Sequence, residues 1–134
     1  MSDLSSFSLE EFPVHLGPGA VALRQARYTG DLTWYPDYEE RCAGDGAEGR
    51  LVMMFTFRES SSTWEVHPQG EELVVCTRGS LVLHQEIDGV VRSTTINGGE
   101  AMINPPGIWH TIDVDAPATA MFITPGVGTE VRTR

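Results

Sequence analysis

The sequence predicts an all-β fold, an antiparallel sandwich or barrel, and three observations lead to this class. The segments that alternate apolar and polar residues are short, and Gly, Pro and Asn separate them. From residue 51 onward, strand starts recur about every ten residues, with no helical pattern between them. The chain has 134 residues, which suits a single domain with its own core.

The first fifty residues give the weaker signals. We expect one or two strands within 20–34, whereas 36–49 is rich in charge and glycine and reads as a loop with at most one helical turn. The two ends, 1–8 and 129–134, are expected to fray.

From residue 51 onward each strand is better defined. The predicted strands are 51–58, 63–67, 72–77, 80–87, 90–96, 101–104, 108–114 and 118–124. The first of them is apolar on both faces, which is typical of a central strand. Asp88-Gly89 lies between two of them and predicts a two-residue hairpin, because glycine readily adopts a positive φ.

Composition and charge exclude several classes of function. Nine basic residues stand against nineteen acidic ones, a net charge of −10, which argues against binding nucleic acid or an anionic membrane surface. No apolar run has the length of a membrane span, and no secretory signal is recognised, so the expected location is the cytoplasm. Two cysteines are too few for a disulfide framework.

Alternation along the predicted strands suggests a polar cluster inside the fold. Glu65 and His67 share one face of 63–67, and Glu72 faces the same way as the apolar residues of 72–77. His110 lies in line with three aliphatic residues of 108–114 and is expected to point inward. Imidazole and carboxylate are ligands for Mn, Fe, Co, Ni or Zn, so these side chains are candidate metal ligands. Spacing alone makes this a weak case, because a single histidine is more often a residue with satisfied hydrogen bonds.

The second half of the chain resembles the cupin superfamily. Its second motif, G-x5-P-x-G-x2-H-x3-N, aligns with Gly99, Pro105, Gly107 and His110, and departs only at the last position, where Val114 replaces Asn. This match covers about residues 99–114.

The first cupin motif, G-x5-H-x-H-x3–4-E-x6-G, aligns with about residues 59–79. His67 takes the place of its second His, Glu72 that of its Glu and Gly79 that of its final Gly. Two positions depart from the motif: Glu65 stands at the first His, and Glu59 stands at the initial Gly.

The resemblance implies a single small cupin domain over 1–134, a double-stranded β-helix or jelly-roll barrel, with its core at about 20–126. It also implies a homodimer. Trp64 and Trp109, on the strand faces away from the candidate ligands, are large apolar groups that a second copy can cover.

Carried over position by position, the resemblance implies a divalent metal, Mn, Fe, Ni or Zn, held by His67, Glu72 and His110. Glu65 is then either a fourth ligand in place of histidine or a nearby catalytic acid/base. In the alternative, the substitution abolishes metal binding, and Glu65 and Glu72 become close like charges that share a proton.

Two classes of function follow from this resemblance. The first is a metal-dependent enzyme that acts on a small oxygen-bearing metabolite, of isomerase, lyase or dioxygenase type. The alternative is a non-catalytic protein that binds a sugar or an organic acid, with or without metal. The fold does not choose between them.

Two other features have open alternatives. Cys76 shares a face with Glu72 and is either a thiol ligand or, as we favour, a small buried apolar residue. The run 35–40 is either a lid over the mouth of the barrel or a solvated loop.

Overall fold

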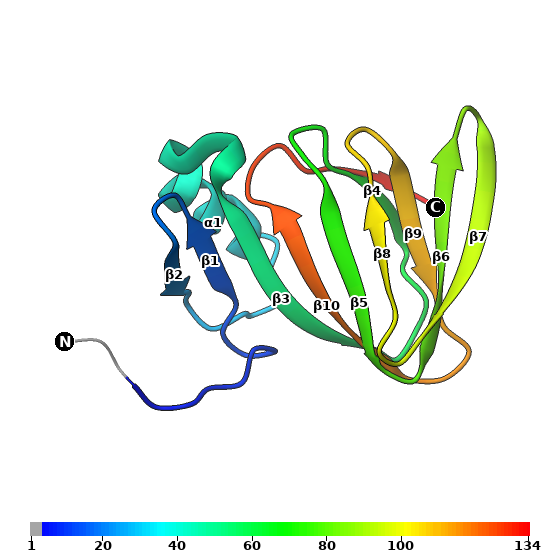
Figure 1. Cartoon of the computed structure of the whole chain (residues 1–134), viewed down its shortest axis with the longest axis horizontal. Helices are drawn as coiled ribbons and strands as arrows, with labels where there is room; N and C mark the ends of the chain where they lie inside the picture. The colour runs from blue at the N-terminus through cyan, green and yellow to red at the C-terminus, as the bar shows by residue number, and fades with distance from the viewer. Residues whose placement is uncertain (1–3) are drawn as a thin grey trace.

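Two antiparallel β-sheets form the framework of the computed structural model, which describes residues 4–134 (Figure 1). The strands are β1 (Val14–Gly17), β2 (Val21–Arg24), β3 (Arg50–Phe57), β4 (Thr63–Val66), β5 (Glu72–Arg78), β6 (Ser80–Ile87), β7 (Val90–Asn97), β8 (Ala101–Asn104), β9 (Trp109–Asp113), β10 (Ala118–Pro125) and β11 (Glu130–Thr133). A six-stranded sheet has the order β2-β1-β3-β10-β5-β8, and a five-stranded sheet has the order β11-β4-β9-β6-β7.

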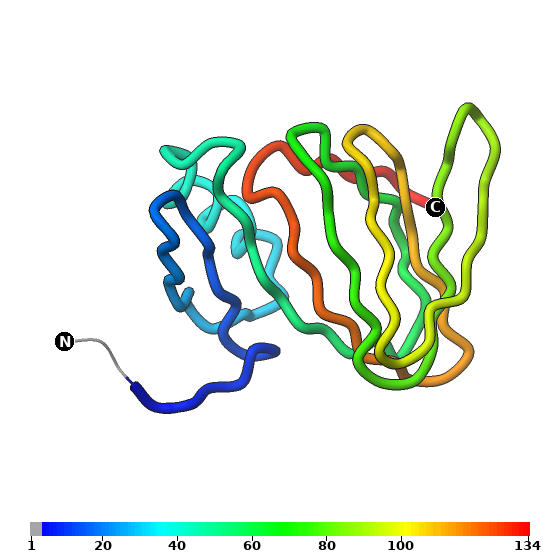
Figure 2. The backbone as a smooth tube through the Cα atoms, viewed as in Figure 1, coloured from blue at the N-terminus to red at the C-terminus, as the bar shows by residue number. Residues whose placement is uncertain are grey.

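The predicted all-β class is confirmed, and each strand predicted from residue 51 onward lies within one residue of its expected ends. The backbone trace in Figure 2 shows these strands following one another across the two sheets. At the tip of the β6–β7 hairpin, Asp88 and Gly89 have φ values of 52° and 77°, as the two-residue turn requires.

The first fifty residues agree with the prediction in one strand and differ from it in a helix. The segment 20–34 contains one strand, β2, and its partner β1 precedes that range. Instead of a loop, 36–49 falls within the helix α1 (Trp34–Cys42) and the 3-10 helix η1 (Ala43–Glu48). The helix forms because Trp34 and Tyr38, four residues apart, bury one face against Leu51 and other apolar side chains.

The expected fraying of 129–134 is wrong. Residues Glu130–Thr133 form β11, which pairs with β4 along its whole length. Both β1 and β11 therefore extend the sheets beyond the range 20–126 expected for the barrel. Residues 4–8 have no helix or strand, and the rest of the predicted N-terminal frayed segment, 1–3, lies outside the described residues.

The core lies between the two sheets and confirms the predicted alternation of strand residues. Its buried members are Val74, Cys76, Leu81, Leu83, Ile96, Ile112, Ala118 and Ala120. Cys76 is one of them, and its Sγ lies 3.5 Å from the carbonyl oxygens of Arg78 and Gly79. It is therefore a buried apolar residue rather than a ligand in the polar cluster.

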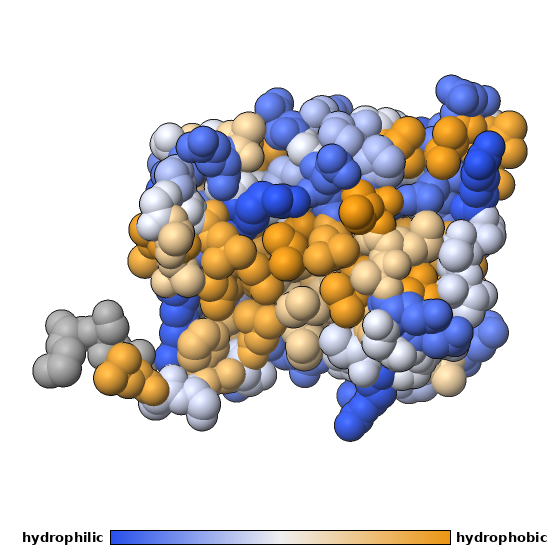
Figure 3. All heavy atoms as spheres, in the orientation of Figure 1, coloured by the Kyte–Doolittle hydropathy of each residue, from blue (hydrophilic) through white to orange (hydrophobic). Residues whose placement is uncertain are grey.

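The outer face of the six-stranded sheet is also partly apolar. Figure 3 shows hydrophobic side chains gathered in a band across this face. On β3, Leu51 and Met53 point inward and are buried, while Val52 and Met54 alternate with them and are half-buried. This agrees with the prediction that 51–58 is a central strand with apolar residues on both faces.

Arg132 of β11 lies over the indole rings of Trp64 and Trp109, which were expected to be covered by a second copy of the chain. The guanidinium of Arg132 lies 5.3 Å from the ring centroid of Trp64 and 4.5 Å from that of Trp109. The same guanidinium pairs with Glu86 at 2.6 Å. The homodimer stays a prediction.

Within residues 4–134, neither helical segment combines the length and hydropathy needed to span a membrane.

Candidate metal centre

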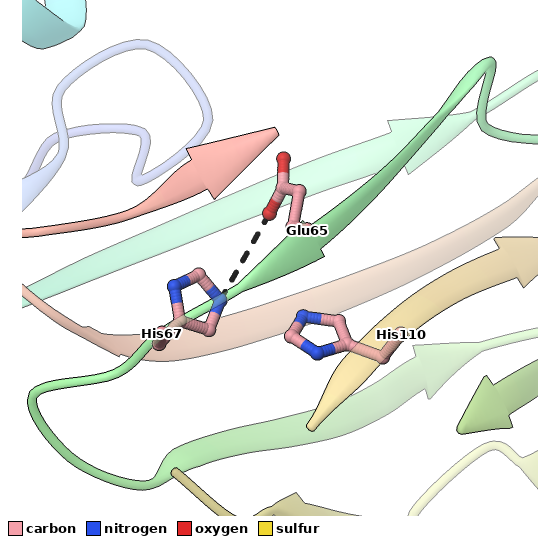
Figure 4. Close-up of side chains that lie close together, drawn as sticks. All are labelled: Glu65, His67 and His110. Atoms are coloured by element: carbon pink, nitrogen blue, oxygen red, sulfur yellow. Dashed lines mark ion pairs between the residues drawn. The ribbon is translucent and has the colours of Figure 1, made fainter. Parts of the chain in front are cut away.

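Three strands bring the four candidate ligands together. Glu65 lies on β4 opposite His110 on β9, since the two are cross-strand partners in the five-stranded sheet. His67 directly follows β4, and a turn at 68–70 leads to the other sheet, where Glu72 begins β5. Figure 4 shows the rings of His67 and His110 close together, with Glu65 above them. The turn between the sheets thus puts Glu72 against both imidazoles.

The carboxylate of Glu72 lies between the two imidazoles. Its Oε2 is 3.1 Å from His67 Nε2, and its Oε1 is 3.2 Å from His110 Nε2. The three residues are 2–5% exposed. A buried carboxylate needs compensating partners, and here the partners are two ring nitrogens.

Both of these ring nitrogens lack a hydrogen bond. Among residues 4–134, three buried side-chain nitrogen or oxygen atoms have no hydrogen-bond partner, and two of them are His67 Nε2 and His110 Nε2. The short distances to Glu72 therefore bring nitrogen and oxygen together without the angles of a hydrogen bond. Buried atoms of this kind are uncommon in a folded protein and call for a partner that the side chains do not provide.

The other nitrogen of each ring is held. His110 Nδ1 lies 3.0 Å from the carbonyl oxygen of Ile108, which only accepts, so Nδ1 carries a proton. A neutral His110 then presents the lone pair of Nε2 to the Glu72 carboxylate, and a cation between them, a proton or a metal ion, removes the repulsion. His67 Nδ1 lies 2.9 Å from the hydroxyl of Thr129. Such contacts at the far nitrogen orient metal-binding histidines.

A second set of polar side chains holds Glu72. Asn104 Nδ2 donates to Oε1 at 3.0 Å, and the hydroxyl of Thr124 donates to Oε2 at 2.6 Å. Asn104 is in turn held by Gln85, whose Nε2 donates to its Oδ1 at 2.7 Å. Both carboxylate oxygens therefore have one donor each and keep electron pairs for a further partner.

Electrostatics of the cluster favour an ionised Glu72. Burial alone would raise the pKa of Glu72, but the two imidazoles more than offset this and lower it well below its usual value. Burial likewise works against a charged His110, yet Glu72 raises the pKa of His110 above its usual value. The ionised Glu72 thus attracts positive charge to the two Nε2 atoms.

Glu65 differs from the other three because its carboxylate faces a cavity. Its Oε2 lies 3.9 Å from His67 Nε2, and its side chain is 47% exposed. Burial in the molecule and the charge of Glu72 both raise the pKa of Glu65. One donor atom each from Glu65, His67 and His110 lie within 4.8 Å of one another.

A cavity of about 470 Å³ opens beside this cluster. Its walls come from both sheets, from α1 and from Tyr28, and the four candidate ligands form part of its lining. The run 35–40, for which a lid and a solvated loop were both open, lies in α1 and contributes Tyr35, Tyr38 and Glu39 to the wall.

The residues present fit a divalent metal ion. Ligands bound at about 2.1 Å and at right angles to each other are about 3.0 Å apart, close to the separations of the Glu72 oxygens from the two Nε2 atoms. Two imidazoles and two carboxylates suit Mn, Fe, Ni or Zn. The types of residue alone would not show that a metal binds here. The two buried Nε2 atoms without hydrogen-bond partners are a separate observation that supports it.

Comparison with known proteins identifies the fold. No protein-family model matches the chain, and no curated protein sequence matches it. Among solved structures, a Klebsiella pneumoniae protein with a double-stranded β-helix domain superposes with a TM-score of 0.52 at 22% identity, over 63% of this chain and 76% of that one. The chain has the fold of a double-stranded β-helix domain.

Two further structures give weaker superpositions. A cupin-2 domain protein from Shewanella frigidimarina has a TM-score of 0.49 at 20% identity, over 57% of this chain and 70% of that one. A hydroquinone 1,2-dioxygenase from Sphingomonas sp. TTNP3 has a TM-score of 0.49 at 13% identity, over 57% and 59%. At these identities the likeness concerns the fold alone.

The sequence analysis missed the residues that support the candidate ligands. Gln85 had a signal, because it is a polar residue on the apolar face of β6, where it is 7% exposed. Asn104 is the cross-strand partner of Glu72, a register that follows only once β5 and β8 are known to pair. Thr129 had no signal, since it lies in the segment expected to fray.

Two histidines of the chain lie outside the cluster. His84 is on the polar face of β6, where Ser93 and Asp113 bind its two nitrogens at 2.6 and 2.7 Å. His15 is buried in a contact with Tyr38 and Asp45.

Proposed function

We propose that the chain is a metal-dependent enzyme in which His67, His110 and Glu72 hold one divalent ion and Glu65 lines its open side. The observation behind the proposal is the pair of buried Nε2 atoms that face the Glu72 oxygens without a hydrogen bond. A metal bound there would polarise an oxygen of a small molecule in the adjacent cavity.

The residues around the ligands have positioning roles in this proposal. Thr129 and the carbonyl of Ile108 hold the Nδ1 atoms, so both Nε2 atoms stay next to the Glu72 carboxylate. Asn104 and Thr124 prevent the Glu72 carboxylate from rotating. Preorganised ligands of this kind reduce the ordering needed when the ion binds.

Glu65 is the residue that we assign to proton transfer. Its carboxylate faces the cavity, so it can reach a bound molecule. Burial and the charge of Glu72 raise the pKa of Glu65, which brings it nearer to the operating pH at which a carboxyl group both takes up and releases a proton.

Metal analysis tests the proposal. Protein purified without a nickel column should contain about one divalent ion per chain, and calorimetric titration of chelator-stripped protein with Zn²⁺ or Mn²⁺ should give the same stoichiometry. His110→Ala should lower the affinity at least a hundredfold, because it removes a direct ligand. His84→Ala, a histidine with two bound nitrogens, is the matched control and should leave the affinity unchanged.

An absence of metal in the native preparation, together with no thermal shift on adding Mn²⁺, Fe²⁺, Ni²⁺ or Zn²⁺, would contradict the metal site. Equal affinity of His110→Ala and the unmodified protein would place the ion elsewhere.

A further inference from the structure

The wall of the cavity formed by the six-stranded sheet is aromatic. Phe55 and Phe57 occupy alternate positions of β3, and their rings meet edge to face at 4.9 Å between centroids. Phe57 meets Phe122 of β10 in the same way at 6.0 Å. All three rings line the cavity, so they form one continuous apolar surface.

Tyrosines supply another part of the wall. Tyr28 and Tyr35 pack edge to face at 5.8 Å, and Tyr35 is held on α1. The hydroxyl of Tyr35 lies 3.4 Å from the sulfur of Met53, an inward residue of β3. The tyrosines and the sheet therefore enclose the cavity together.

Two of these rings leave much of their surface uncovered. Phe55 is 42% exposed and Tyr35 is 45% exposed, although both line the cavity. Apolar ring surface that faces a cavity is covered when an apolar ligand binds there.

The charged residues of the wall disfavour an anionic ligand. The carboxylates of Glu39, Glu65 and Glu72 line the cavity, and its described lining contains no Lys or Arg. A divalent ion would balance Glu65 and Glu72 and leave Glu39, which is held by the backbone N–H of Gly128 at 2.9 Å. An anion would find no positive side chain other than the two imidazoles.

The hydroxyl groups of the wall are mostly engaged. Those of Thr124 and Thr129 bind Glu72 and His67, and that of Thr111 donates to the carbonyl of Thr63 at 2.8 Å. A sugar needs many hydrogen-bond partners when it loses its water, and the engaged hydroxyl groups leave fewer of them on this wall.

From these observations we propose that the cavity takes an uncharged, ring-bearing molecule, with its ring against Phe55 and Tyr35 and its oxygen substituent toward His67 and His110. The position of the oxygen rests on the proposed metal site, but the preference for an uncharged ring does not. Neither a sugar nor an anionic organic acid suits this wall.

A matched series of three probes tests the preference. Benzyl alcohol, benzoate and myo-inositol have similar sizes but differ in charge and polarity. We expect benzyl alcohol to bind at least tenfold more tightly than either of the others, measured by NMR titration of both the chelator-stripped and the metal-loaded protein. If benzoate or myo-inositol binds as tightly as benzyl alcohol, the proposal is wrong.

Variants at neighbouring positions of β3 locate the binding. Phe55→Leu should weaken benzyl alcohol binding at least threefold, and Phe55→Tyr, which keeps the ring, should restore it. Met54→Leu, on the outer face of the same strand, is the matched control and should bind as the unmodified protein does. Melting curves check that all three variants fold. Equal binding by Phe55→Leu and Met54→Leu would overturn the proposal.

The stripped protein separates this proposal from the metal site. If no metal binds but the ring preference holds, only the proposed function fails. If metal binds and the ring preference fails, only the present inference fails.

Discussion

The protein buries histidines in two clusters that differ in whether every ring nitrogen has a hydrogen-bond partner. His15 is 1% exposed, and both of its nitrogens are bound, Nδ1 to the hydroxyl of Tyr38 at 2.7 Å and Nε2 to Asp45 at 2.6 Å. His67 and His110 are also buried, at 2% and 5% exposed, but each has one bound nitrogen and one without a partner.

This difference separates a structural histidine from a candidate ligand. The His15 cluster joins β1, α1 and η1, and its hydrogen bonds are complete within the chain. The other cluster leaves two ring nitrogens without hydrogen-bond partners next to a carboxylate, which favours a cation. Burial alone therefore does not make a histidine a candidate metal ligand. The distinguishing feature is a buried ring nitrogen without a hydrogen-bond partner.

The largest expected effect is on stability. His15→Ala should lower the free energy of unfolding by about 3 kcal/mol, because it opens a cavity and leaves the Tyr38 hydroxyl without its partner. Chemical denaturation of the chelator-stripped protein measures this. Metal stoichiometry should not change, and a loss of metal in this variant would contradict the separation of the two clusters.

A smaller effect is expected from the group that orients His67. Thr129→Val removes the hydroxyl that lies against Nδ1 and should weaken metal binding about tenfold. Thr133→Val, at the exposed end of β11, is the control and should have no effect. Equal affinities of the two variants would show that Thr129 does not position His67.

Rising pH should increase the metal affinity of the protein but lower the stability of the stripped protein. Glu72 raises the pKa of His110, so protons compete with metal up to a higher pH than for a free imidazole, and affinity should rise about tenfold per pH unit until that pKa is passed. In the stripped protein the charged His110 stabilises the fold below its ordinary pKa of 6.5, and this contribution is lost as the pH rises.

Thermal shifts at a series of pH values measure both trends. The stabilisation by added Zn²⁺ should grow from pH 6 to pH 8. A shift that is independent of pH would mean that no proton is displaced from the ligands.

The smallest effect on metal affinity is expected at Glu65. Glu65→Gln keeps the shape but removes a charge 3.9 Å from His67 Nε2, and should weaken binding several-fold rather than abolish it. If Glu65 is only an acid/base, metal content stays the same and turnover is lost. In a protein without metal, the same variant should instead raise the melting temperature, because repulsion from Glu72 is relieved. Metal content, turnover and melting temperature of this one variant separate the three outcomes.

Strand alternation predicted that the four polar side chains converge, because β-strands have a period of two and the connections from residue 51 onward are short. Glu65, His67, Glu72 and His110 all face inward as the pattern implied. The first motif of the resemblance, at 59–79, covers β4 and β5, and the second, at 99–114, covers β8 and β9.

The His15 cluster could not be predicted in this way. Its contacts join residues 23 and 30 positions apart, and they depend on a helix whose local sequence is polar and contains Pro36. The pairing of β11 with β4 is likewise a tertiary contact, since a short polar segment near the end of the chain has no strand signal of its own.

Anomalous X-ray diffraction from crystals of the stripped protein soaked in Zn²⁺ tests the central claim most directly. The account predicts one strong peak per chain, at about 2.0–2.2 Å from His67 Nε2, His110 Nε2 and an oxygen of Glu72. No peak at this position, or a peak only at the fully hydrogen-bonded His15 or His84, would contradict it.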